Sequence, residues 1–228
     1  MGTGLARPDQ ARRPAMPDTD RASEHWTLRE AILGSAAGYR TFKVVTRGDE
    51  TMRRMADEYV RPEPGDRILD VGCGYGDLSA VLRDVSYVGV DMNRRYIAFA
   101  QRQHHEAAEF VVGDVTKLSK DDLGDFDCAV AIGVLHHLND AQCTSMLEAV
   151  STMLRPNGRF VAAEPTWDPN QRTTARVLAA LDRGRYVRER SRYEALVAPW
   201  FASTVSDIRH DLFWFPYTHC MITATMGG

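Results

Sequence analysis

The chain has 228 residues, 44% of them hydrophobic, which is enough for one α/β domain with a full core. A net charge of −3 produces no field that would attract nucleic acid or an anionic membrane surface, so neither is expected as a partner. No run of 18 apolar residues is present, which excludes a membrane-spanning helix, and the four cysteines show no metal-type spacing. These features predict a reduced, cytoplasmic protein with no bound metal, acting as a monomer or homodimer.

The amino-terminal quarter of the chain has two compositions. Residues 1–22 are rich in Arg, Pro, Asp and Ala and almost without apolar side chains, which predicts a disordered tail. Residues 23–61 turn helical, because apolar residues recur on one helical face: Met52, Met55, Tyr59 and Val60. Pro62 and Pro64 then end this region of N-terminal helices.

A glycine-rich turn follows the first predicted strand. The strand covers Ile68–Val71, a helical pattern covers residues 78–82, and three glycines at alternate positions connect them: Gly72, Gly74 and Gly76. Such a turn presents bare backbone N–H groups to the polar or anionic end of a ligand. The next strand ends at Asp91, 17 residues after Gly74, which is the usual range for a carboxylate that binds a ribose.

Strands and helices alternate from Asp91 to about residue 165. Residues 109–112 and 126–132 are short apolar strands, and helix caps are predicted at Asn93 and at Asn139. This alternation predicts a parallel sheet covered by helices on both faces. Ligands of such sheets bind at the carboxyl ends of the strands, where the chain places Asp70, Asp91, Asp114 and the 133–137 loop.

In this order, the segments resemble the motifs of the class I (seven-stranded, Rossmann-like) S-adenosylmethionine-dependent methyltransferases of the small-molecule type. The resemblance covers roughly residues 66–165. Its motifs are Asp70 with the glycine turn, Val112–Val115, Phe126–Leu138 and Leu154–Phe160.

The resemblance implies a single methyltransferase domain over residues 23–228. Its mostly parallel seven-stranded sheet would have helices on both faces and an antiparallel last strand. The implied parts are N-terminal helices at 23–61, a cofactor-binding core at 66–165, a helical lid segment at 166–200 before strand six and closing strands at 201–226.

The resemblance also implies S-adenosyl-L-methionine as cofactor, with S-adenosyl-L-homocysteine left as product. Asp91 is implied to accept hydrogen bonds from both ribose hydroxyls, and Asp114 from the adenine amino group. Val115 would give a backbone donor to the adenine ring, and Met92 would pack on its face. The residues implied to surround the methionine end are Asp70, Gly72, Cys73, Gly74, Gly133 and Val134, with the Gly133 carbonyl meeting the ammonium group.

The loop after strand four indicates a small-molecule acceptor. Family members that methylate adenine N6 or glutamine carry Asn/Asp-Pro-Pro-Tyr/Phe there, whereas this chain has Gly133–His137. We expect His137 to face the acceptor as a general base, because a neutral imidazole can remove a hydroxyl proton near pH 7. His136 would then point away, since successive side chains of an extended loop diverge. The alternative is that His137 only shapes the loop.

Seven arginines between residues 172 and 192 mark the predicted lid. The side chains expected to contact an anionic or sugar-like acceptor are Arg183, Arg185, Tyr186 and Arg188, because guanidinium groups suit phosphate or carboxylate. Tyr39 is expected to close the pocket from the N-terminal helices. The alternatives are solvated helix faces for the arginines and core packing for Tyr39.

The expected activity is methyl transfer to an O, N or C atom of a small metabolite, such as a sugar or an intermediate of natural product biosynthesis. Two alternatives stay open at this point. One is a methyltransferase fold that uses the cofactor for non-methylating chemistry or only for binding. The other is a nicotinamide-dependent oxidoreductase, which the glycine spacing disfavours because dinucleotide folds prefer G-x-G-x-x-G.

Overall fold

The structure, a computed structural model, describes residues 48–104, 108–180 and 185–228. The expected tail at 1–22, the N-terminal helices before residue 48, Tyr39 and Arg183 lie outside the described residues. The strands are β1 (Arg67–Val71), β2 (Ser86–Asp91), β3 (Ala108–Val112), β4 (Phe126–Ile132), β5 (Leu154–Trp167), β6 (Arg188–Glu189), β7 (Ser203–Arg209) and β8 (His219–Thr225). The α-helices are α3 (Gly48–Met55), α4 (Arg94–Gln103), α5 (Lys120–Leu123), α6 (Asp140–Met153), α7 (Thr173–Ala180) and α8 (Arg190–Val197).

The sheet has the strand order β3-β2-β1-β4-β5-β8-β7. Neighbouring strands from β3 to β5 are parallel, and β8 is antiparallel to both β5 and β7. The predicted α/β fold with an antiparallel last strand is therefore confirmed. The structure adds β6, a two-residue strand beside the end of β5 that the sequence did not predict.

Short helical turns complete the fold. They are the π-helical turn η1 (Ala56–Val60) and the 3-10 turns η2 (Asp77–Ala80), η3 (Val115–Lys117), η4 (Leu135–His137) and η5 (Ala198–Trp200). The helix expected after the glycine turn is only η2, because the chain must reach the start of β2 at Ser86 within a few residues. Among the described residues, no helix combines the length and the apolar character that crossing a membrane requires.

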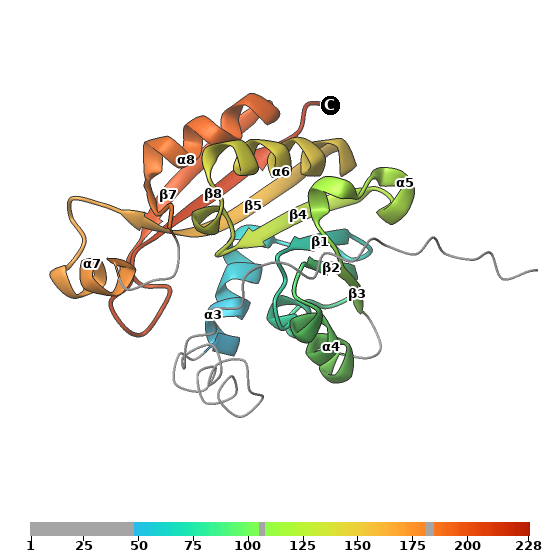
Figure 1. The fold of residues 1–228 in the computed structure, drawn as a ribbon, viewed down its shortest axis with the longest axis horizontal. Helices are drawn as coiled ribbons and strands as arrows, with labels where there is room; N and C mark the ends of the chain where they lie inside the picture. Colours follow the sequence, from blue (N-terminus) through green and yellow to red (C-terminus); the bar gives the residue numbers. More distant parts are fainter. Residues whose placement is uncertain (1–47, 105–107, 181–184) are drawn as a thin grey trace, which may run out of the picture. The chain divides into compact units, whose positions relative to one another are not determined.

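Helices cover both faces of the sheet, with α6 and α8 on one face and α3 and α4 on the other (Figure 1). Side chains of a strand alternate between these two layers. Leu69 packs with the buried residues of α6 and α8, whereas its neighbour Ile68 packs with those of α4. In the same way Ala129 and Val130 of β4 belong to opposite layers. Because both faces of these strands are buried, their sequences are nearly continuous apolar runs.

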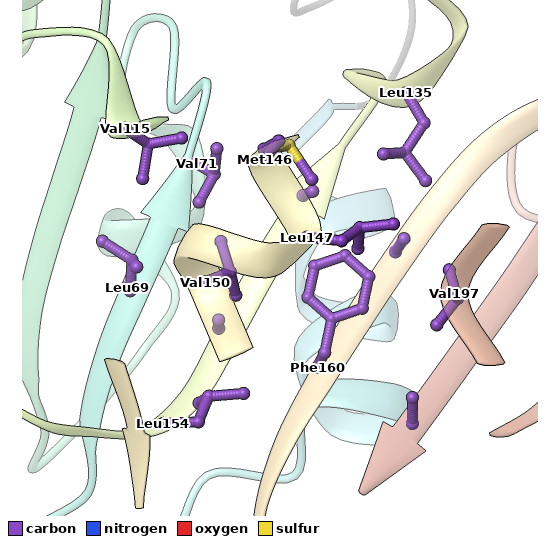
Figure 2. Packing of buried hydrophobic residues seen from close by; sticks show 14 of the residues in the cluster. Leu69, Val71, Val115, Leu135, Met146, Leu147, Val150, Leu154, Phe160 and Val197 are labelled. Atoms are coloured by element: carbon purple, nitrogen blue, oxygen red, sulfur yellow. The ribbon is translucent and has the colours of Figure 1, made fainter. Parts of the chain in front are cut away.

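Phe160 of β5 lies in the larger of these layers. Its side chain is fully buried and stacks on Phe201, with 5.6 Å between the ring centroids and 18° between the planes. Figure 2 shows the ring between Leu147 of α6 and Val197 of α8. Phe160 therefore ties two helices to the centre of the sheet.

Replacing Phe160 with Ala should lower the free energy of unfolding by about 3–5 kcal/mol, because it removes a buried ring and leaves a cavity. Denaturant unfolding would measure this loss. Val205→Ala on the edge strand β7 is the matched control, because Val205 is 66% exposed and should change stability by no more than about 0.5 kcal/mol. Equal losses in the two variants would contradict the central role of Phe160.

Candidate functional site

The turns after β1 and β4 meet at the carboxyl edge of the sheet. Here the strand order reverses, because β2 lies on one side of β1 and β4 on the other. Gly72 has a φ of +69°, and a Cβ added there would lie 2.8 Å from Cγ2 of Val134. Only glycine lets these two turns approach so closely. Open α/β sheets bind ligands in the crevice at such a reversal.

Asp91 is held in place at the end of β2 by two backbone N–H groups. Gly74 donates to its Oδ2 at 3.0 Å, and Asn93 donates to its Oδ1 at 2.7 Å. Burial raises the pKa of this carboxyl group, and the two N–H donors oppose that rise. A carboxylate has about four acceptor positions, so both oxygens of Asp91 retain capacity for a further donor.

A cavity of about 550 Å³ opens beside Asp91. Met92, Asp114 and Val115 line it together with Asp91, so the structure brings together the four residues predicted to hold the adenosine end of the cofactor. Met92 is 73% exposed, which leaves its apolar side chain available to a flat ring. Asp114 is oriented by η3, because its Oδ1 accepts from the Thr116 N–H at 3.1 Å.

Two residues expected at the methionine end turn their side chains into the core. Oδ2 of Asp70 accepts from the Tyr87 hydroxyl at 2.6 Å, and burial raises the pKa of Asp70 to about 7. The Cys73 side chain packs against Gly89, where an added Cβ would lie 2.8 Å from Sγ, and burial raises the pKa of this thiol. The cavity is lined by Gly72 and Val134 of the expected set.

The loop after β4 is organised by Glu164, a fully buried residue near the end of β5. Its Oε1 accepts from the backbone N–H groups of Val134 at 2.9 Å and Leu135 at 2.8 Å. Its Oε2 accepts from the His136 N–H at 3.2 Å and lies 2.6 Å from Nδ1 of the same residue. No sequence pattern predicted a role for Glu164, although an acid directly after the apolar run 160–163 is a usable signal.

The two histidines face in the opposite sense to the prediction. His136 is buried against Glu164, whereas His137 is exposed, and their ring centroids lie 4.0 Å apart. The expectation assumed an extended loop, but Leu135–His137 forms the 3-10 turn η4. Three successive N–H groups then converge on Glu164, which draws His136 inward.

The described residues that were predicted to contact the acceptor also differ in burial. Arg188 is buried, and its guanidinium donates to the carbonyls of Leu135 at 2.8 Å and Leu138 at 2.6 Å, and to Asp140 at 2.9 Å. Because these contacts occupy its donors, Arg188 positions the loop, and the structure contradicts an acceptor role. Arg185 and Tyr186 are exposed, and the Tyr186 N–H donates to the carbonyl of His136 at 3.0 Å.

Residues 68–158 match a family described as a methyltransferase domain. A demethylmenaquinone methyltransferase from Beutenbergia cavernae is 34% identical over 126 residues, which cover 53% of this chain and 51% of the relative. A fatty-acid O-methyltransferase from Mycolicibacterium smegmatis is 35% identical over 111 residues, which cover 46% and 39%. The chain spans about a third to a half of the length of the curated relatives it matches first.

Solved structures show the same fold. A phosphoethanolamine N-methyltransferase from Haemonchus contortus, determined with S-adenosylhomocysteine, superimposes with a TM-score of 0.69 at 14% identity. The superposition covers 87% of this chain and 59% of the other. Magnesium protoporphyrin IX methyltransferase from Synechocystis has a TM-score of 0.64 at 17% identity, covering 87% and 98%.

Asp70→Asn should remove a pH dependence of stability. In the folded state Asp70 keeps its proton up to a pH of about 7. In the unfolded state, where the aspartate pKa is the ordinary 3.8, it loses the proton at a lower pH. The Asp70 contribution is therefore fully present below about pH 4 and is lost as the pH rises through about 7, by at most about 1.4 kcal/mol per pH unit. Denaturant unfolding at pH 5 and pH 8 measures the effect. The free energy of unfolding of the variant, relative to that of the wild type, should be higher at pH 8 than at pH 5.

Asp121→Asn, on the exposed side of α5, is the control and should follow the wild type at both pH values. If the difference between Asp70→Asn and the wild type were the same at pH 5 and pH 8, Asp70 would not be the titrating group.

Proposed function

We propose that the chain is a class I S-adenosylmethionine-dependent methyltransferase that transfers the cofactor's methyl group to an O, N or C atom of a small metabolite. The observation that carries this proposal is the cavity at the carboxyl edge, next to an Asp91 carboxylate whose two oxygens are already oriented by Gly74 and Asn93. The candidate acceptors are sugars and intermediates of natural product biosynthesis, and the proposed location is the cytoplasm.

The residues present fit the cofactor. Asp91 has acceptor capacity left for the two ribose hydroxyls, and Met92, Asp114 and Val115 line the space where adenine would lie. Gly133 and Val134 would flank the methionine end, where the close approach of Gly72 and Val134 narrows the crevice. When bound, the cofactor supplies an electrophilic methyl group on a sulfonium.

We propose His136, in place of His137, as the general base for a hydroxyl acceptor. Glu164 accepts three backbone N–H groups of the loop, and a carboxylate oxygen accepts, so Nδ1 of His136 is the donor in their 2.6 Å contact. In the neutral imidazole the second nitrogen, Nε2, then carries the lone pair. A carboxylate that orients the imidazole of a base in this way is a recurrent catalytic arrangement.

Relatives named for demethylmenaquinone and for fatty-acid O-methylation support a small-molecule acceptor. The loop at 133–137 supports it too, because it lacks the Pro-Pro pair of the adenine and glutamine methylating members. The main task of the remaining residues is to align the acceptor atom with the methyl group in a crevice without water. Two reacting groups held in the correct geometry react far faster than the same groups free in solution.

Asp91→Ala should weaken binding of S-adenosylhomocysteine by about 1.5–3 kcal/mol, roughly 10- to 150-fold, because it removes a charged acceptor. Isothermal titration calorimetry measures the change. Asn93→Ala is the matched control, since it removes the cap of α4 from the same turn and leaves the carboxylate in place. Tighter binding of NAD than of S-adenosylhomocysteine by the wild type would favour the oxidoreductase alternative and overturn the proposal.

His136→Gln should lower the turnover of a hydroxyl acceptor by about 10²–10⁴-fold and leave the affinity for S-adenosylhomocysteine unchanged. The acceptor is chosen by screening phenols and alcohols with methyl-labelled cofactor. The residual rate should rise with pH as the acceptor ionises by itself. His137→Gln is the matched neighbour and should lose less than about 3-fold; a larger loss there than in His136→Gln would restore the original expectation.

A further inference from the structure

A second cavity, of about 380 Å³, lies at the end of the sheet that carries β5 and β8. The segment between β7 and β8 forms one side, and residues 170–175 at the start of α7 form the other; these two segments lie side by side in Figure 1. Strand register connects this cavity to Glu164, because Pro165, next to Glu164, pairs with His219, and the neighbouring Thr218 lines the cavity. The Thr166 N–H also donates to the carbonyl of Thr218 at 3.2 Å.

The walls of this cavity are mainly aromatic. Phe213 and Phe215 stack with 4.8 Å between ring centroids and 9° between planes, and Tyr217 lies edge-on to Phe213 at 6.0 Å. Trp214 is 60% exposed and stands edge-on to Phe215 at 5.9 Å. Flat rings in stacked and edge-on arrangements offer both contact geometries that a further aromatic ring prefers.

Among the residues that line this cavity, the formally charged side chain is positive. Arg172 lines the cavity with an exposed side chain that forms no ion pair within the described ranges, and Asn170 and His210 also line it. The lining contains no Asp or Glu. Aromatic walls can also bind ammonium groups, but the guanidinium of Arg172 would repel a cation here. A carboxylate or phosphate, in contrast, matches its planar donor fork.

We propose that this cavity is the acceptor subsite for a planar aromatic molecule that carries an anionic group. The aromatic walls would hold the ring, and Arg172 would bind the anion. The volume lies at the low end of the range for small-molecule sites, which fits one compact molecule. That the bound molecule is the methyl acceptor rests on the proposed function. That it is aromatic and anionic is inferred from the residues lining the cavity alone.

Three naphthalene probes test the ligand class on the full chain. Saturation-transfer NMR titrations should rank 1-naphthoate first, neutral 1-naphthol second and 1-naphthylmethylammonium last. Arg172→Gln should lower the affinity for 1-naphthoate at least 10-fold and change the affinity for 1-naphthol by less than 2-fold. Trp214→Ala should weaken both. Arg176→Gln is the matched control, because Arg176 lies one helical turn further along α7 and lines a different cavity.

Failure of this inference is distinct from failure of the proposed function. If the chain binds S-adenosylhomocysteine but not 1-naphthoate, or if Arg172→Gln binds 1-naphthoate as well as Arg176→Gln does, the subsite is overturned and the cofactor site stands. Tightest binding of 1-naphthylmethylammonium overturns it also. If 1-naphthoate binds through Arg172 but S-adenosylhomocysteine does not bind, the ligand chemistry is upheld and the methyltransferase proposal falls.

Discussion

The carboxylate of Glu164 is the contact on which the arrangement of the site depends. A buried charge is costly unless hydrogen bonds replace its lost water, and Glu164 has four: three consecutive backbone N–H groups and Nδ1 of His136. These bonds connect β5 to the loop that follows β4. The loop in turn fixes Val134 against Gly72, so the two turns that border the crevice take their spacing from one acid.

Arg188 complements Glu164 from the other side of the same loop. The acid accepts the N–H groups of the loop, and the guanidinium donates to the carbonyls of Leu135 and Leu138. Backbone N–H and C=O groups at the buried residues of η4 are thereby hydrogen-bonded within the protein, as buried backbone groups require. Val134 of this loop lines the proposed cofactor site together with Asp91 and Asp114, whereas the aromatic cavity is lined by the segment between β7 and β8 and by residues before and in α7.

Local patterns predicted the fold, and they indicated which residues meet at the carboxyl edge of the sheet. Glycines at alternate positions and acids at strand ends are short-range signals, and they placed Asp91 and Asp114 on one cavity. The prediction was wrong where a long-range contact decides. Nothing near His136 in the sequence indicates a partner 28 residues away, and nothing near Arg188 indicates carbonyls about 50 residues away. The prediction of a longer helix after Gly76 was also wrong. The number of residues available before β2, and not helix propensity, limits the length of η2.

A crystal structure with S-adenosylhomocysteine tests the account most directly. Both ribose hydroxyls should lie within about 2.5–3.0 Å of the Asp91 carboxylate oxygens, adenine should lie between Met92 and Asp114, and the sulfur should face the loop held by Glu164. The bonds from Glu164 to Val134, Leu135 and His136 should be unchanged in that complex. A ribose bound away from Asp91, or a cofactor seated outside the crevice between Gly72 and Val134, would contradict it.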